Sequence, residues 1–546
     1  MVMGIIELTT QIKQGKHMHI GVDFGTTYTK IAFCSEGRLE QFHYPSPPNA
    51  HPYVPTAVAY QVRNGRQVIS IGEAARSDAI NEEDVVFCEN MKMLLPLKSE
   101  ADWRHHGWNA TCSPREVMRD YLHHLLRASD DSFERRIGQM GRIVVSVPEL
   151  WQRQTNLGAE TLRQILVDDL QLPVDHLQSE PVCAAAYYIS QVKPDLTKPL
   201  HLLVCDMGGG TFDMVLCRVL QTTQGYKIQV LDFDGKGQLG LGSAGVAFDQ
   251  QVVRIAYQKK GRKFDLHDSD VIADIRAFEK SKLENHEKVK ESLQEKFAKY
   301  RNDPDFRDTR FYSWNRKEDS VTFEEVCTSF DPIRAGIEQV MKPLLARTQA
   351  QNWSIDRVAL VGGFSQFPLV EETILECLGM RGSNDQPRAL QQLTSDERFF
   401  AIARGAALIA QGSVQIEEYF PHTLELIIHR QRPNLHKIAL PIVEAGQMLA
   451  GRVHPYYAQQ DGRDVLVDVR EQSYGNLPVQ LRLMGKDEPM KLATSMTEFP
   501  PPGRYRVGLL VDRANIGTLV FDPVEDGEQR RYLLGEISPS LLLEES

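Results

Sequence analysis

Short apolar runs and longer stretches of mixed polarity alternate along the chain up to about residue 412. Five of the runs are rich in β-branched residues and stop near a glycine, a proline or a turn, which is typical of buried strands. They read HIGVDFG, KIAF, RIVVSV, HLLVCDMG and RVALVGG. Because helical stretches lie between them, the pattern predicts an α/β architecture over residues 18–412.

Two segments depart from this alternation. About residues 250–320 are highly charged, and the run KSKLENHEKVKESLQEKFAKY predicts a mostly helical subdomain with a solvated polar face. After Gly412, runs such as TLELIIHR, KIALPIV and RYRVGLLVD recur between turn residues. They predict a β-sandwich-like domain over residues 413–546, and residues 1–17 are expected to form an N-terminal extension.

Composition narrows the class of protein. A chain of 546 residues is too long to fold around a single hydrophobic core, so more than one domain is expected. Apolar residues make up 42% and charged residues 25%, which is the profile of a globular protein. Lys and Arg total 62 against 73 Asp and Glu, a net charge of −11, which argues against nucleic acid or an anionic membrane as the main partner. The cysteines form no C-x-x-C pair, no apolar run has the length of a membrane span, and no secretory signal pattern precedes the first strand. These features predict a cytoplasmic protein.

The chain repeats one strand–turn–strand plan. HIGVDFGTTYTKIAF, residues 19–33, and LLVCDMGGGTFDMVL, residues 202–216, each read as a buried strand, a turn of glycine and threonine, and a second strand. Asp23 closes the first strand of one copy and Asp206 that of the other. Two plain glycine-rich hairpins are the alternative, but the shared plan favours a ligand site.

Phosphate is the ligand that suits such turns. Glycine permits positive φ and lets a ligand approach the backbone, so successive N–H groups can form an anion-binding concavity. Thr26, Thr27 and Thr211 add hydroxyl donors. Because Asp23 and Asp206 would repel bare phosphate, a hydrated divalent cation such as Mg²⁺ is expected between them.

A third glycine site is RVALVGGFSQFP, residues 357–368. Strand-like residues run into Gly362 and Gly363, and then Ser365 and Pro368 suit the start of a helix. Glycines at the carboxyl end of a buried strand lie where α/β folds accept ligands. A plain strand-to-helix turn is the alternative.

In this order and spacing, the three motifs resemble the heat-shock-seventy (DnaK-like) chaperones of the actin-like ATPase superfamily. The resemblance runs from about Met18 to Gly412, and VPTAVAY, SIGEAA, IVVSVPELW and SEPVCAAAYY are similar to further segments of that family. It implies a two-lobed actin-like ATPase domain with duplicated ribonuclease-H-like sheets, followed by a smaller β-domain. The implied ligands are ATP and Mg²⁺, with K⁺ as a candidate further ion.

The resemblance also assigns roles to residues. Glu180 matches the family's glutamate near the attacking water, although a carboxylate before Pro181 would also suit a helix N-terminus. Lys92, in VFCENMKMLLPL, falls where the family places its catalytic lysine, with an exposed lysine as the alternative. The implied catalytic residues are Glu180, Lys92, Asp206 and Thr211, and the implied metal ligands are Asp23, Asp206 and Asp213. The implied nucleotide-binding residues are Gly25, Thr26, Thr27, Tyr28, Gly208, Gly209, Gly210, Thr211, Glu279, Lys282, Gly362, Gly363, Phe364 and Gln366.

The adenine side departs from the family pattern. Glu279 and Lys282 fit the family's ribose-contacting pair. Leu283 and Gln366, however, stand where the family has two arginines that flank the ring, and Phe364 replaces a serine. A triphosphate with Mg²⁺ is therefore better supported than selectivity for adenine.

The leading functional hypothesis is a slow, ATP-dependent chaperone-like ATPase whose lobe closure controls peptide or protein binding by the C-terminal β-domain. The linker region SVQIEEYFPHTLELII lacks the family's leucine run, and no helical lid is expected after the β-domain. By resemblance, the partners are a client peptide or one dedicated protein, with a J-domain co-chaperone and a nucleotide exchange factor. The alternatives are a nucleotide-switched scaffold, including an actin-like filament former, and, as a distant third, a sugar kinase.

Overall fold

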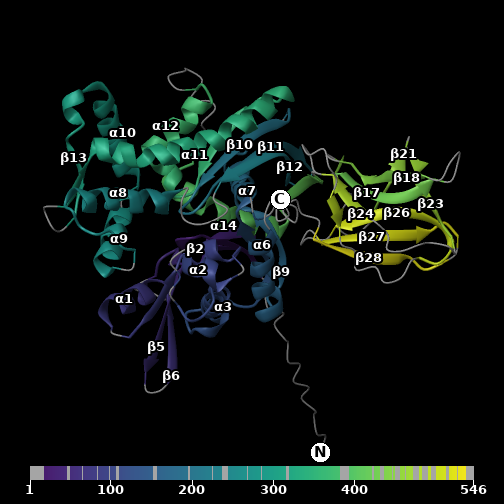
Figure 1. Ribbon diagram of the computed structural model, residues 1–546, viewed down its shortest axis with the longest axis horizontal. Coiled ribbons are helices and arrows are strands. Elements are labelled where there is room, and N and C mark those ends of the chain that lie inside the picture. The colour runs from purple at the N-terminus through teal and green to yellow at the C-terminus, as the bar shows by residue number, and fades with distance from the viewer. Residues whose placement is uncertain are drawn as a thin grey trace, which may run out of the picture.

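The computed structural model shows a two-lobed body with a β-rich region at one side (Figure 1). The structure describes residues 18–45, 50–63, 66–82, 84–97, 99–105, 108, 110–149, 151, 156–194, 197–223, 225–236, 244–266, 268–283, 286–314, 319–380, 393–420, 423–430, 436–444, 447–448, 455–460, 463–470, 479–482, 490–492, 500–511, 516–525 and 527–536. None of the helices in these ranges is long and apolar enough to cross a membrane.

The first lobe, purple to blue in Figure 1, is built on a sheet with strand order β3-β2-β1-β8-β9, and β4 pairs with β2. β1 and β2 are antiparallel, whereas β8 runs parallel to both β1 and β9. β1 and β8 are nearly continuous apolar runs because both faces of this sheet are covered. The strands are β1 (Met18–Phe24), β2 (Tyr28–Ser35), β3 (Arg38–Gln41), β4 (Val54–Pro55), β8 (Met140–Val147) and β9 (Val174–Ser179).

A small antiparallel sheet and several helices complete the first lobe. The sheet has the order β6-β5-β7 and projects away from the body, beside α1 (Figure 1). Its elements are β5 (Ala57–Arg63), β6 (Arg66–Ile71), α1 (Glu73–Asn81) and β7 (Val86–Glu89). The remaining elements are η1 (Met91–Leu94), α2 (Glu100–His105), α3 (Pro114–His123), η2 (His124–Ala128), α4 (Phe133–Arg136), α6 (Asn156–Arg163) and η3 (Gln164–Asp169).

The second lobe, teal to green, is built on a sheet with the order β15-β10-β11-β12-β16-β19. Its elements are β10 (Leu200–Met207), β11 (Phe212–Thr222), β12 (Gly225–Lys236), α8 (Gly245–Lys259), α9 (Ser269–Leu283), α10 (His286–Asn302), η4 (Pro304–Phe306), β13 (Arg310–Ser313), β14 (Ser320–Thr322), α11 (Phe323–Ala350), β15 (Arg357–Val361), η5 (Phe364–Gln366) and α12 (Pro368–Cys377). An aromatic core that includes Phe248, Phe330 and Phe367 packs the helices against this sheet.

The two lobes repeat one arrangement. In each lobe, two antiparallel strands form a hairpin, β1–β2 in the first and β10–β11 in the second. The first strand of each hairpin also pairs in parallel with a third strand, β1 with β8 and β10 with β15. The predicted pair of strand–turn–strand copies therefore forms the centre of two equivalent sheets. This confirms the predicted α/β class with two lobes.

Two helices join the lobes. α14 (Ser395–Gln411) packs on β1 and β2, α7 (Glu180–Val192) packs on β10 and β11, and the two helices pack on each other. They approach so closely because α14 carries a glycine at the contact: a Cβ on Gly405 would lie 1.7 Å from the carbonyl oxygen of Cys183. A Cβ on Gly21 of β1 would likewise lie 2.2 Å from the Ala403 carbonyl oxygen. Backbone contact on both sides fixes α14 between the lobes.

The β-rich C-terminal region contains two larger sheets that share a core. Their orders are β18-β17-β24-β25 and β20-β26-β27-β28, with β23 paired to β26. Leu424 and Leu426 of one sheet belong to the same apolar cluster as Val507 and Phe521 of the other. The strands are β17 (Thr423–Arg430), β18 (His436–Val443), β20 (Tyr456–Tyr457), β21 (Gln459–Gln460), β22 (Arg463–Asp464), β23 (Leu466–Val469), β24 (Val479–Arg482), β25 (Met490–Leu492), β26 (Gly503–Val511), β27 (Ile516–Pro523) and β28 (Arg530–Glu536). This arrangement agrees with the expected β-rich C-terminal region.

The connection between the body and this region is itself a strand. β16 (Val414–Phe420) runs parallel to β12 and extends the sheet of the second lobe, and β19 (Gln447–Met448) pairs with the end of β16. The chain turns into β16 at Gly412, whose φ of 87° ends α14. The division into domains at residue 412 stays a prediction.

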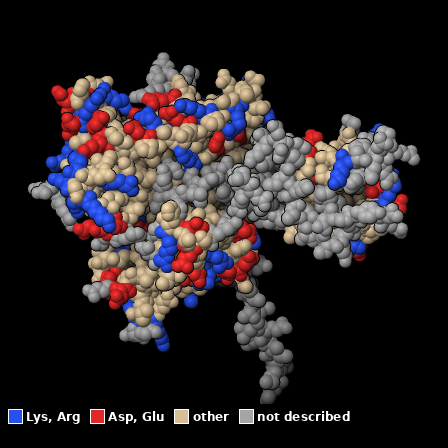
Figure 2. Space-filling model, viewed as in Figure 1, with Lys and Arg blue, Asp and Glu red and all other residues tan. Residues whose placement is uncertain are grey.

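Acidic and basic side chains are intermixed over the visible described surface of the two lobes (Figure 2). The visible described surface therefore shows no large patch of a single sign of charge.

Candidate functional site

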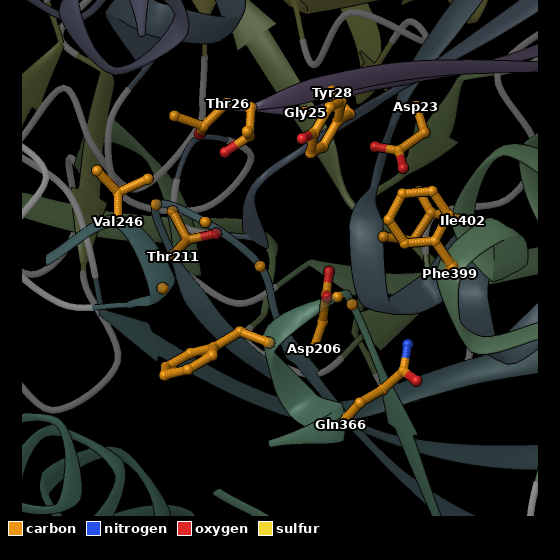
Figure 3. A pocket seen from close by; sticks show the side chains of 18 of the residues that line it. Asp23, Gly25, Thr26, Tyr28, Asp206, Thr211, Val246, Gln366, Phe399 and Ile402 are labelled. Atoms are coloured by element: carbon orange, nitrogen blue, oxygen red, sulfur yellow. The ribbon is translucent and has the colours of Figure 1, made fainter. Parts of the chain in front are cut away.

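Both hairpins open into one pocket between the lobes, seen from close by in Figure 3. Thr26, Thr211 and Val246 lie on one side of this view and Asp23 and Phe399 on the other. The lining residues are Asp23, Gly25, Thr26, Thr27, Tyr28, Lys30, Lys92, Glu180, Asp206, Gly208, Gly209, Gly210, Thr211, Gly245, Val246, Asp249, Glu279, Leu293, Gly362, Gly363, Phe364, Gln366, Phe367, Phe399 and Ile402. All residues expected from the sequence to bind nucleotide or metal, or to act in catalysis, are in this set, apart from Asp213 and from Lys282, whose side chain lies outside the described residues.

The first hairpin places Asp23 at the end of β1, where its side chain is buried. Its cross-strand neighbour is Lys30 on β2, whose Nζ donates to Oδ2 of Asp23 at 2.7 Å. The turn is held from outside by Thr56, whose hydroxyl donates to the Gly25 carbonyl oxygen at 2.9 Å. Glycine is required at position 25, because a Cβ there would lie 2.4 Å from the Tyr28 carbonyl oxygen.

The second hairpin faces the first tip to tip. A Cβ on Gly209 would lie 2.5 Å from the hydroxyl oxygen of Thr27, and a Cβ on Gly210 would lie 2.7 Å from that of Thr26. The glycines therefore leave room beside the second turn for the threonine hydroxyls of the first. Both turns line the same pocket, and threonine hydroxyls and backbone N–H groups are donors of the kind that suits phosphate oxygens.

Lys92 and Glu180 meet in this pocket from different elements. Lys92 lies in η1, and Glu180 is the first residue of α7. Lys92 Nζ donates to Glu180 Oε1 at 2.5 Å, and the two residues are only 2% and 6% exposed. The lysine is therefore not an ordinary surface side chain. Burial raises the pKa of Glu180, although the nearby Lys92 charge opposes that shift.

Carboxylates dominate the floor of the pocket. Burial and the Glu180 charge raise the pKa of Asp206 well above its usual value. Asp213, the cross-strand neighbour of Asp206, is fully buried behind the lining, and burial and Glu180 also raise its pKa. Acidic groups that disfavour each other's ionisation in this way favour a bound cation.

The carboxylates of this pocket suit a metal ion that keeps some of its water ligands better than an ion bound directly by several side chains. Within the described ranges, no group of three or more His, Cys, Asp or Glu side chains is arranged to hold a metal ion. Mg²⁺ keeps several of its waters and is commonly held by one or two carboxylates together with phosphate oxygens. Asp206 and Asp23, opposite the phosphate-type turns, provide that donor set.

The third glycine motif closes the floor. Gly362 follows β15 with a φ of 83°, and a Cβ there would lie 2.5 Å from Oδ1 of Asp206. Both the backbone conformation and the space therefore require glycine. Phe364 is two residues further along the chain, at the start of η5. Its ring stacks on that of Phe367, with centroids 5.7 Å apart, and also contacts Phe248.

Apolar side chains also line the pocket, among them Leu293, Phe364, Phe367, Phe399 and Ile402. Among the described lining residues there is no arginine, in agreement with the substitutions at positions 283 and 366. Glu279 lines the pocket from α9. Lys282 lies in the same helix, but its side chain is outside the described residues, as is that of Leu283.

Sequence reasoning missed several lining residues. Lys30 stands within the quoted first hairpin, and its position opposite Asp23 follows from antiparallel pairing. Phe399 and Ile402 come from the first half of α14, and no motif in the sequence marks them as pocket residues.

Two equivalent sheets, with a phosphate-type hairpin from each lobe turned into one cleft, define the class of actin-like two-lobed ATPases. The chain belongs to the Hsp70 protein family, whose model matches residues 98–418, more than half of the chain. Members of this family are ATPases that bind ATP with Mg²⁺.

Curated relatives agree with this assignment at low identity. The chain is 26% identical over 413 residues to "Chaperone protein DnaK" of Ureaplasma urealyticum serovar 10, covering 73% of this chain and 59% of the relative. It is 26% identical over 425 residues to "Heat shock cognate 70 kDa protein 3" of Dictyostelium discoideum, with 72% and 60% coverage. It is also 26% identical over 429 residues to "Heat shock 70 kDa protein BIP3" of Oryza sativa subsp. japonica, with 72% and 56% coverage. The match thus spans about 60% of the length of these relatives.

Proposed function

We propose that this chain is an ATP-dependent molecular chaperone that hydrolyses ATP in the pocket between its lobes and couples this reaction to binding of peptide or protein by its C-terminal β-region. The observation that carries the proposal is the meeting of the two glycine hairpins with the buried Lys92–Glu180 pair in one pocket. The names of the relatives, which include chaperones and heat-shock proteins, support the same conclusion.

Different residues of the pocket have different proposed roles in ATP hydrolysis. Backbone N–H groups of the turns and the hydroxyls of Thr26 and Thr211 hold the phosphates and donate to charge that develops during in-line attack of water. Glu180, with its raised pKa, orients the attacking water and accepts its proton, and Lys92 holds that carboxylate in place. Mg²⁺, held through Asp206, supplies positive charge to the phosphate oxygens when bound.

The proposed coupling between the nucleotide pocket and the C-terminal β-region rests on the strand that connects them. β16 belongs to the second lobe's sheet and leads directly into β17 of the C-terminal core. A change in the angle between the lobes therefore moves β16, and with it the start of β17 in the C-terminal region. Coupling free energies of about 1–3 kcal/mol are typical of such linked sites. The partners we propose are extended apolar client segments, a J-domain co-chaperone and a nucleotide exchange factor.

The test is the ATPase rate of the full chain with and without a panel of unrelated extended peptides. We expect slow basal turnover that several peptides stimulate, with Asp206→Asn as the inactive control. Turnover that no peptide stimulates would argue against the chaperone proposal and favour a nucleotide-switched scaffold. Absence of any nucleotide binding would overturn both.

A further inference from the structure

The two hairpins differ at one equivalent position. In the second hairpin, the cross-strand neighbour of Asp206 is another acid, Asp213. In the first, the neighbour of Asp23 is Lys30. The repeat therefore carries a cation in one lobe exactly where the other lobe carries an anion.

Lys30 is held firmly toward the pocket. Its Nζ lies 2.7 Å from Oδ2 of Asp23 and 4.4 Å from the centroid of the Phe399 ring, and the residue is only 8% exposed. Figure 3 shows Asp23 and Phe399 facing each other on the same side of the pocket. An ammonium group between a carboxylate and an aromatic face is stabilised by both. Lys30 nevertheless lines the pocket, so its charge is felt there.

Asp23, Glu180 and Asp206 are the lining acids at the ends of β1 and β10 and at the start of α7, and lysines pair with two of these three. Lys30 pairs with Asp23, and Lys92 pairs with Glu180. Within the described part of the chain, Asp206 forms no ion pair with a lysine or an arginine. Of these three acids, Asp206 is therefore the one left to attract a mobile cation.

We propose that Lys30 is a built-in cation of the nucleotide site, which takes over from dissolved metal part of the charge compensation that the phosphates and Asp23 require. Asp206 is then the main anchor of the bound divalent ion, and Asp23 contributes chiefly through Lys30. The consequence is that nucleotide stays bound when Mg²⁺ is removed. This inference rests on the proposed function of the pocket.

A purely structural role for Lys30 predicts something different. A buried ion pair that only supports β1 and β2 would change the unfolding midpoint when it is broken. It would not change how strongly nucleotide affinity depends on Mg²⁺. The ratio of affinities with and without the metal separates the two roles, and it does not require turnover.

The experiment is calorimetric titration of the full chain with ADP, in excess Mg²⁺ and again in EDTA. For the natural chain we expect chelation to weaken ADP binding by about tenfold or less. For Lys30→Met we expect about a hundredfold or more, because a unit charge a few ångströms from phosphate contributes strongly at the low dielectric of a pocket. Lys30→Arg, which keeps the charge, should follow the natural chain.

Lys30→Gln, which retains a donor for Asp23 without the charge, is the second variant if Lys30→Met does not fold, and it should behave like Lys30→Met. Equal chelation ratios for the natural chain and the neutral variants would overturn the inference while leaving the proposed ATPase intact. If the natural chain binds no ADP under either condition, the proposed function itself fails.

Discussion

Lys92 and Glu180 form a buried ion pair across 88 residues of sequence, with Nζ 2.5 Å from Oε1. The lysine reaches the pocket from η1 in the first lobe, and the glutamate begins the helix that crosses toward the second. The pair is therefore placed where it responds to the relation between the lobes.

Glu180→Gln and Lys92→Met should each slow turnover while leaving nucleotide affinity nearly unchanged. In the proposed mechanism Glu180 acts on the attacking water and Lys92 holds that carboxylate in place, so the loss of either removes interactions that strengthen only in the transition state. We expect kcat to fall by about 10²-fold or more in each variant. Single-turnover rates and ADP titration measure the two quantities separately.

The double variant provides the control for this pair. Residues that act as a unit are non-additive, so the double variant should lose little more activity than either single one. Fully additive losses would show that Lys92 and Glu180 act independently. Full activity of Lys92→Met would remove the lysine from the mechanism.

Asp206→Asn should weaken Mg²⁺-dependent hydrolysis strongly while the fold is retained. The carboxylate lies on the pocket floor, beside Gly362 and opposite the phosphate-type turns. The amide cannot hold the ion through a negative charge, so the Mg²⁺ concentration that gives half-maximal rate should rise at least about tenfold. A Mg²⁺ titration of the ATPase rate, with circular dichroism as a folding control, measures this effect. An unchanged titration would place the metal elsewhere.

The pocket should discriminate poorly between ATP and GTP. The described lining residues include no arginine, so cation–π contacts worth about 0.5–2 kcal/mol each are lost. Phe364 lines the pocket, and its ring would stack on either purine. We expect dissociation constants for the two nucleotides within about tenfold of each other. Calorimetry with both nucleotides in Mg²⁺ decides the point, and strong rejection of GTP would require specific adenine contacts from other residues.

Gly405→Ala should destabilise the chain severely. The added Cβ would fall 1.7 Å from the Cys183 carbonyl oxygen, so α14 must move away from α7. Overpacking of this kind costs about 1–3 kcal/mol or more in the free energy of unfolding. Urea unfolding of the variant measures the loss.

Gly336→Ala is the matched control for that prediction. Gly336 lies inside α11, and its added Cβ would meet only the flexible Lys236 side chain, no closer than 3.6 Å. Helix propensity then favours alanine by about 0.5–1 kcal/mol. The same substitution should thus stabilise one helix and disrupt the other, whereas equal effects would contradict the packing argument.

The sequence allowed prediction of the parts of the site that local chemistry controls. Asp23, Asp206 and the glycine turns were recognisable because each motif carries its own conformational requirement. The α/β class was equally accessible, since periodicity is a local property.

What could not be predicted depends on packing between distant segments. Phe399 enters the pocket because of how α14 sits against β1 and β2, and no motif marks that position. Asp213 was expected beside the metal; it is the cross-strand neighbour of Asp206, but it is fully buried and does not line the pocket, so its role as a metal ligand stays a prediction. The pairing of Lys30 with Asp23 required the hairpin register, which a sequence alone does not display.

The parallel pairing of β16 with β12 provides β12 with a partner strand from the same chain. A strand at the rim of a sheet presents unpaired N–H and carbonyl groups that can template another chain. Here the backbone of β12 from Tyr226 to Val230 is covered by residues 414–418 of the same chain. A fragment that ends at residue 412 would expose the N–H and carbonyl groups of β12 that β16 now pairs. We expect this fragment to self-associate more than the longer chain does.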